Sequence, residues 1–146
     1  MTINFDMDGT IADLYSVENW LPMLRAYDPT PYASAKPLLP MTLLLALLLK
    51  VKEKGYEVNI LSWSSKQSTA AYDREVETAK RKWLADNLPQ FPFDNIKVVP
   101  YGTPKSSLAS GILFDDEEKN RTEWEAVAGN TAYEPSDIFK ILEKIA

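Results

Sequence analysis

Short apolar runs alternate with longer segments of helical periodicity along the chain. Four runs have the length and composition of buried strands, at residues 2–5, 56–61, 95–99 and 111–114, and a fifth short strand fits residues 131–133. Apolar residues at helical spacing predict helices over residues 17–27, 40–54, 67–88, 118–128 and 135–145. Short buried strands that alternate with helices predict one α/β domain, with a parallel sheet covered on both faces.

Two segments depart from this simple alternation. Residues 28–40 contain four prolines and cannot hold regular structure for long. The helix predicted at residues 40–54 is apolar on nearly all sides, so we expect other elements to cover more than one of its faces. Its apolar run could also form a dimer surface, which leaves the monomer and the homodimer both open. The run is far shorter than the roughly 20 residues of a membrane span, and no membrane role is expected.

Composition narrows the chemistry that the chain can carry out. The net charge is −5, which gives no general basic surface for nucleic acid. The chain contains neither cysteine nor histidine, so disulfides, thiolate ligands, imidazole bases and histidine zinc sites are all excluded. Catalysis would depend on carboxylates, hydroxyls, lysines and a hard metal ion. The first residues do not resemble a targeting signal, and we expect a cytoplasmic protein.

Chemically active side chains follow several of the predicted strands. In parallel sheets of this kind, ligands bind at the carboxyl ends of the strands. Asp6 and Asp8 follow the first strand, and because side chains alternate in extended backbone, both carboxylates point to the same side. The pair Asp115-Asp116 adds carboxylates after the fourth strand. An acid-rich, all-oxygen pocket of this kind suits Mg²⁺.

Two further residues complete a pattern that is typical of phosphoryl transfer. Ser62 follows the second strand and offers a hydroxyl donor, and Lys105 lies shortly after the third strand and offers a positive charge. Both groups are natural partners of a phosphate. With a carboxylate as nucleophile, the set predicts phosphoryl chemistry.

The same residues resemble the motifs of the haloacid dehalogenase (HAD) superfamily. Residues 5–11, Phe-Asp-Met-Asp-Gly-Thr-Ile, match its first motif, apolar-Asp-x-Asp-Gly-Thr-apolar. Ser62 ends a strand as in the second motif, and Lys105 lies ten residues before Asp115, where the lysine of the third motif is expected. Residues 112–116 resemble the fourth motif, an apolar strand followed by paired acids. The resemblance implies a three-layer Rossmann-like domain over residues 1–146, with residues 15–40 as at most a small cap or lid.

The resemblance also implies a mechanism, that of a magnesium-dependent phosphatase. Asp6 would attack phosphorus and form an aspartyl phosphate, and Asp8 would protonate the leaving oxygen and then deprotonate water. The ion would be held by the Asp6 carboxylate, the main-chain carbonyl of Asp8, and Asp115. Asp116 would replace or assist Asp115.

Substrate contacts are also implied by the resemblance. Ser62 and Lys105 would bind the transferring phosphoryl group. Thr10 of the first motif and Trp63, which follows Ser62, complete the set of candidate substrate-binding residues.

The substrate stays open at this point. A small cap leaves a nearly open site, which admits bulky substrates. One candidate is a nucleotide, as for the 5′(3′)-deoxyribonucleotidases, whose base would stack on aromatic residues in the segment between residues 15 and 32. Another is a phosphorylated nucleic-acid end, as for the 3′-phosphatase domain of polynucleotide kinases. The alternative to an enzyme is a non-catalytic module that binds phosphate or a partner.

The basic residues Lys80, Arg81 and Lys82 are expected on a solvated helix face.

Overall fold

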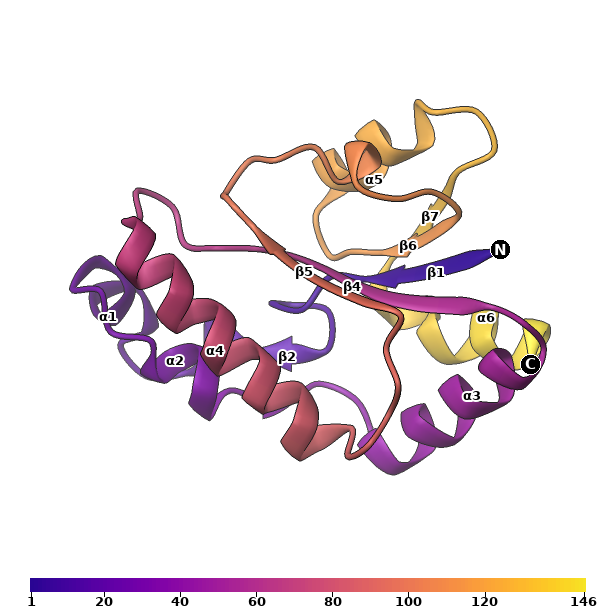
Figure 1. Ribbon diagram of the computed structural model, residues 1–146, viewed down its shortest axis with the longest axis horizontal. Helices are drawn as coiled ribbons and strands as arrows, with labels where there is room; N and C mark the ends of the chain where they lie inside the picture. The colour runs from indigo at the N-terminus through magenta and orange to yellow at the C-terminus, as the bar shows by residue number, and fades with distance from the viewer.

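Five parallel strands form the central sheet in the computed structural model, which describes residues 1–146 (Figure 1). Their order across the sheet is β5–β4–β1–β6–β7. The strands are β1 (Thr2–Phe5), β4 (Glu57–Trp63), β5 (Asn95–Val99), β6 (Ile112–Phe114) and β7 (Thr131–Tyr133). All neighbouring pairs are parallel, which confirms the predicted sheet. The chain progresses outward from β1 in one direction to β5 and then crosses back to β6 and β7, so the strand order reverses beside β1.

Helices cover both faces of the sheet. They are α1 (Trp20–Arg25), α2 (Thr30–Ser34), α3 (Met41–Glu53), α4 (Ala70–Asn87), α5 (Glu118–Glu125) and α6 (Ile138–Ile145). Side chains of α3, α4 and α6 share one large core with Ile3 and Phe5 of β1. Helix α5 lies on the other face (Figure 1). Its Trp124 forms a smaller core with Leu61 and Leu113. None of the helices has both the length and the apolar character that a membrane span requires.

Helix α3 begins and ends close to the predicted residues, but its surroundings differ from the prediction. Gly55 follows it with φ +91°, a conformation that favours glycine after a helix. Its buried residues recur at helical spacing on one side, at Leu44, Leu47, Leu48 and Val51. Leucines on the other side remain exposed, Leu43 by 43% and Leu49 by 44%. The expectation that more than one face would be covered is therefore wrong.

A small helical layer, residues 12–37, leaves the sheet between β1 and α3. Its two ends pair as a short antiparallel ladder, β2 (Ala12–Asp13) with β3 (Lys36–Pro37). Helices α1 and α2 lie between these strands and are seen beside α4 in Figure 1. Buried residues of the layer, including Leu14 and Tyr32, pack against Tyr72 and Val76 of α4.

The first helix of this layer is shorter than predicted. The pattern indicated a helix over residues 17–27, whereas α1 has only six residues. Asn19 before it and Tyr27 after it both adopt left-handed backbone, with φ +61° and +58°. Because an α-helix cannot continue through such residues, both ends are fixed by the backbone turn. The layer takes its shape from its packing on α4.

Candidate active site

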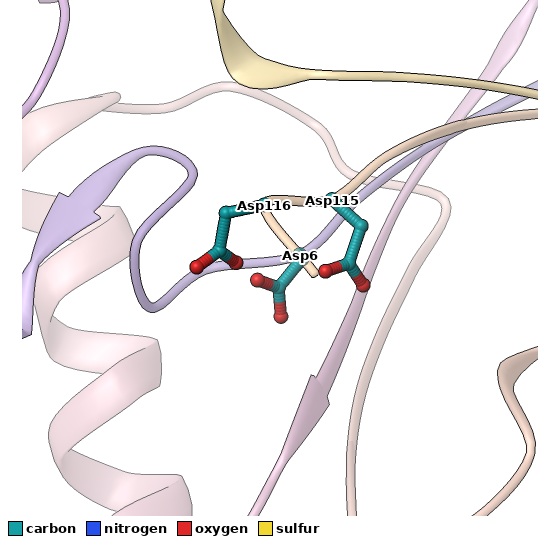
Figure 2. A group of neighbouring side chains, drawn as sticks. All are labelled: Asp6, Asp115 and Asp116. Carbon is teal, nitrogen blue, oxygen red and sulfur yellow. The ribbon is translucent and has the colours of Figure 1, made fainter. Parts of the chain in front are cut away.

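Three carboxylates meet where β1 and β6 end side by side. The main-chain N–H of Asp6 donates a hydrogen bond of 2.9 Å to the Phe114 carbonyl, which keeps this residue in the ladder with β6. Asp115 and Asp116 follow β6 immediately. Figure 2 shows the three side chains converging, and one oxygen from each lies within 4.8 Å of the others. Asp115 is completely buried and Asp6 nearly so.

Such close carboxylates repel one another unless a proton or cation lies among them. Burial is the largest cause that raises the pKa of Asp115 to about 6, and the negative charge of Asp6 adds to it. Burial and then Asp6 also raise the pKa of Asp116 to about 8. Three hard oxygen donors with excess negative charge are what Mg²⁺ selects in proteins. The donor set of Asp6, Asp115 and Asp116 therefore fits the predicted ion.

Lys105 lies between two of these acids and neutralises one charge. It begins a short 3-10 helix, Lys105–Ser107, after β5. Its Nζ lies 2.8 Å from Asp6 Oδ1 and 2.7 Å from Asp115 Oδ2, and only 3% of its side chain is exposed. Desolvation alone would lower the pKa of Lys105, but the charges of Asp6 and Asp115 raise it above its ordinary value. Lys105 is thus a permanent cation, held against the proposed nucleophile.

The turn after β1 fixes Asp6 from the other side. The hydroxyl of Thr10 donates a 3.0 Å hydrogen bond to Asp6 Oδ2 and accepts one of 3.2 Å from the Asp116 main-chain N–H. Gly9 has φ +81°, and a Cβ on it would collide with the Asp116 carboxylate. Glycine is therefore required here, both for the turn and for the close approach of Asp116.

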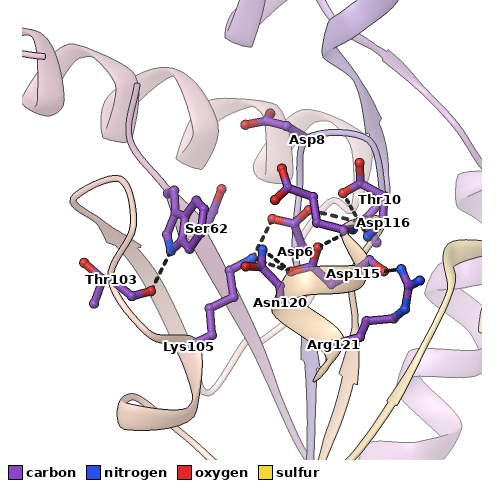
Figure 3. A network of polar contacts seen from close by, with 12 residues as sticks. Asp6, Asp8, Thr10, Ser62, Thr103, Lys105, Asp115, Asp116, Asn120 and Arg121 are labelled. Atoms are coloured by element: carbon purple, nitrogen blue, oxygen red, sulfur yellow. Dashed lines mark hydrogen bonds and ion pairs between the residues drawn. The ribbon is translucent and has the colours of Figure 1, made fainter. Parts of the chain in front are cut away.

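The carboxylate of Asp8 lies apart from this cluster and points toward α4 (Figure 3). It pairs with Lys80 of α4, whose Nζ is 2.9 Å from Asp8 Oδ2. The same Nζ donates to Ser62 Oγ at 2.6 Å and to the Trp63 carbonyl at 2.7 Å. Burial raises the pKa of Asp8, and the Lys80 ammonium opposes that shift.

The position of Lys80 corrects the sequence prediction. Lys80 is 1% exposed, whereas the sequence placed it with Arg81 and Lys82 on a solvated face. A signal for burial was present, because Lys80 lies four residues after Val76 and three before Trp83, on the buried stripe of the helix. Its neighbours Arg81 and Lys82 are exposed as predicted.

A cavity of about 360 Å³ opens beside Asp6 and Asp8. Aromatic residues line much of it, from the small helical layer, the end of β4 and the loop after β5: Tyr15, Trp20, Tyr32, Trp63 and Tyr101. Tyr15 and Trp20 meet edge to face, with ring centroids 5.0 Å apart. The cavity also contains the positively charged side chains of Arg25 and Lys66.

Trp63 joins this cavity to the loop that carries Lys105. Its ring contacts Tyr101, with centroids 4.9 Å apart, and its Nε1 donates a 2.8 Å hydrogen bond to the Thr103 carbonyl. The Lys105 ammonium lies 5.5 Å from the centre of the Trp63 ring. Trp63 therefore both lines the cavity and steadies the loop.

The remaining sequence candidates lie at different depths. Thr10 and Ser62 are completely buried and outside the cavity lining, where their hydroxyls contact Asp6 and Lys80. A direct role for either in binding substrate stays a prediction. Ser64 and Ser65, just beyond Ser62, do line the cavity. Strand β4 continues through Trp63 rather than ending at residue 61, so the strand rather than the turn carries Ser62.

Sequence reasoning missed two residues of α5 that hold Asp115. Asn120 donates a 3.2 Å hydrogen bond to Asp115 Oδ2 and also lines the cavity. Arg121 donates to the Asp115 carbonyl at 3.0 Å. Both lie in the first turn of α5, directly after the paired acids. This closeness in sequence to Asp115 could have indicated that they contact it.

Among solved structures, the chain is similar to D,D-heptose 1,7-bisphosphate phosphatase from B. bronchiseptica, crystallised with magnesium and phosphate. The TM-score is 0.57 and the sequence identity is 13%, and the match covers 99% of each chain. No family model matches the sequence. No curated protein sequence matches it either. The similarity spans the whole chain, and it shows that the chain shares the α/β fold of that phosphatase, as the predicted parallel sheet with helices on both faces implied.

Proposed function

We propose that the chain is a magnesium-dependent phosphatase that hydrolyses a phosphomonoester through an aspartyl phosphate on Asp6. The observation that carries the proposal is the set of groups around Asp6. It faces a cavity, shares a metal-sized cluster with Asp115 and Asp116, and is held on either side by Lys105 and Thr10. A carboxylate fixed in this way can attack phosphorus without reorganisation of its surroundings.

The reaction has two steps. An oxygen of Asp6 forms a bond to phosphorus as the bond to the leaving oxygen breaks, and Asp8, which enters this step protonated, donates its proton to that oxygen. Asp8 then takes a proton from water, which attacks the aspartyl phosphate and releases inorganic phosphate. Lys105 stays charged throughout and stabilises the negative phosphoryl oxygens beside Asp6.

The metal would be held beside the nucleophile. The carboxylates of Asp6 and Asp115 and the main-chain carbonyl of Asp8 would be ligands, with Asp116 as a further donor. When bound, Mg²⁺ would neutralise negative charge on the phosphate and on the carboxylates. The neighbour's magnesium and phosphate support this assignment.

We propose a nucleotide as substrate. The cavity has the size of a small-molecule site, and Tyr15, Trp20, Trp63 and Tyr101 offer aromatic faces or edges to a base. Residues 15–40 would then act as a small cap, since they contribute much of this wall. The neighbour acts on a sugar bisphosphate, whereas the aromatic lining of this cavity favours a substrate with a base. A phosphorylated nucleic-acid end could use the same aromatic rings, but the net charge of −5 favours the mononucleotide.

The test is phosphate release from a panel of substrates: deoxynucleoside 5′- and 3′-monophosphates, a 3′-phosphorylated oligonucleotide and p-nitrophenyl phosphate. We expect turnover with Mg²⁺, reversible loss in EDTA, and the highest kcat/KM for a mononucleotide. Asp6→Asn should abolish turnover. Asp86→Asn makes the same change at an exposed position of α4 and should leave turnover intact.

Each contrary outcome points to a definite alternative. Activity that persists in EDTA or in Asp6→Asn contradicts the chemistry. A preference for the oligonucleotide over every mononucleotide indicates a nucleic-acid end as substrate. No turnover of any substrate, with Mg²⁺-dependent binding of beryllofluoride, indicates a phosphate-binding module.

A further inference from the structure

A second buried lysine lies beside the site, and the proposed chemistry does not use it. Lys80 is 1% exposed, and its ammonium donates three hydrogen bonds, at 2.9 Å to Asp8, 2.6 Å to Ser62 and 2.7 Å to the Trp63 carbonyl. An ammonium group has three donors, so none is left for a ligand. Lys80 is also absent from the residues that line the cavity. It therefore cannot contact the substrate in this arrangement.

Asp8 is the one negatively charged group that pairs with Lys80. Its other two partners are neutral oxygens, and the ring of Tyr32 covers it, with Nζ 4.8 Å from the ring centroid. An ammonium in such a place is costly unless a carboxylate compensates it. Asp8 is the carboxylate in contact, so the pair is held by strong electrostatic attraction and by directed hydrogen bonds.

These contacts connect Asp8 to the rigid part of the fold. Asp8 itself lies beyond the end of β1, in an isolated β-bridge with Ala12 just before the turn at Gly9. Lys80 fastens the carboxylate to the end of β4, through Ser62 and Trp63, and to helix α4. It also keeps Asp8 separate from Asp6, whose two oxygens are already bonded to Lys105 and Thr10.

We propose that Lys80 is a positioning residue, which holds Asp8 where it can protonate the leaving oxygen. This inference rests on the proposed function. It makes a chemical prediction, because leaving groups differ in their need for a proton. An alkoxide must be protonated as the P–O bond breaks, whereas a nitrophenolate can leave as the anion.

The experiment compares two probes that differ by one methylene, p-nitrophenyl phosphate and p-nitrobenzyl phosphate, with saturating Mg²⁺. The quantity measured is kcat/KM, because it includes leaving-group departure and excludes the later hydrolysis of the aspartyl phosphate. For Lys80→Met we expect a loss of about 100-fold with the benzyl ester and of about threefold or less with the phenyl ester. Lys82→Met, an exposed position on the same helix, should change neither value.

A double mutant separates positioning from a general loss of structure. If Lys80 acts through Asp8, Lys80→Met should cause no further loss of kcat/KM in an Asp8→Asn background. An additive loss, or an equal loss with both esters in the single mutant, would overturn the inference while leaving the phosphatase assignment intact. A wild-type protein that hydrolyses no phosphomonoester would overturn the proposed function, and this inference with it.

A second variant covers the case in which Lys80→Met does not fold. The chain contains no cysteine, so Lys80→Cys introduces a single thiol. Alkylation of that thiol with 2-bromoethylamine in denaturant gives a lysine analogue with sulfur in place of one methylene. After refolding, the analogue should restore the wild-type ratio of benzyl to phenyl kcat/KM. Failure to restore the ratio, when wild-type protein survives the same treatment, would also overturn the inference.

Discussion

Two buried lysines each neutralise one carboxylate of the Asp6-Met7-Asp8 turn, and the centres they form are different. Lys105 pairs with Asp6 and Asp115, and Asp116 adds a third carboxyl group beside them, so that the first centre has two more carboxyl groups than lysines. Lys80 meets the Asp8 carboxylate and two neutral oxygens, so that the second centre is balanced. An excess of carboxylates attracts a cation, whereas a balanced pair does not. The charge balance therefore favours the first centre for the proposed metal and the second for the proposed proton-transferring group.

The largest expected effect is that of Lys105→Met. It leaves Asp115, which is fully buried, and Asp6, with 11% of its side chain exposed, without a cation when metal is absent. Breaking a buried ion pair of this kind costs about 3–5 kcal/mol in the free energy of unfolding. Loss of the charge beside the phosphoryl group should also lower kcat by about 10²- to 10³-fold. Urea unfolding in EDTA and steady-state kinetics measure the two effects.

Lys80→Met provides the matched comparison for stability. It leaves only Asp8 unpaired, and the Asp8 side chain is 17% exposed and can reach water. We therefore expect a smaller loss in the free energy of unfolding for Lys80→Met than for Lys105→Met. Equal losses would show that the two centres do not differ in the way their exposure and charge indicate.

The two centres also differ in how far the sequence could predict them. Asp6 and Asp115 follow β1 and β6, whose apolar pattern is clear, and the ends of neighbouring parallel strands must lie together. Lys105 could be placed beside them by its spacing of ten residues before Asp115. The contact between Lys80 and Asp8 spans 72 residues and depends on where a helix crosses the sheet. Lys80 belongs to a run of three basic residues, and that local run obscured its place on the buried stripe of α4.

The same distinction applies to the fold. The strands at residues 2–5, 95–99 and 131–133 have the predicted bounds, because a short apolar run between turn residues determines a strand locally. The small helical layer at residues 12–37 was not predictable in detail. Its helices are short, and their ends depend on left-handed backbone at Asn19 and Tyr27 and on packing against α4. The periodicity of a short segment cannot encode such contacts.

A smaller effect should distinguish the centres by metal affinity. Asp116→Asn removes a carboxylate from the first centre and should weaken Mg²⁺ binding by about tenfold or more. Asp8→Asn makes the same chemical change at the second centre but retains the main-chain carbonyl, so Mg²⁺ affinity should remain near that of the wild type. The midpoint of thermal stabilisation during a Mg²⁺ titration measures both. Equal weakening in the two variants would place the Asp8 carboxylate on the metal and contradict the assignment.

The smallest expected effect is a dependence of thermal stability on pH in the absence of metal. Because the pKa of Asp115 is about 6 and that of Asp116 about 8 in the folded chain, against 3.8 ordinarily, the folded state retains protons that the unfolded state releases. Their stabilising contribution is complete below the ordinary pKa and is lost as the pH rises through 6 to 8. We expect Tm in EDTA to fall by several degrees between pH 5 and pH 8.5, of the order that 1–2 kcal/mol produces.

Magnesium should counteract this fall of Tm with pH, because the ion replaces the protons that the first centre would otherwise hold. The increase in Tm on adding Mg²⁺ should therefore be larger at pH 8.5 than at pH 5. Asp28 and Asp94 have lowered pKa values, so their contributions are lost only as the pH falls below about 4, outside this range. Asp116→Asn serves as the control, since it removes the group with the higher pKa and should flatten the profile in EDTA. A metal-free Tm that rises toward pH 8.5 would contradict the prediction. It would show that the carboxylates of the first centre do not repel one another, and the contrast between the two centres would fail.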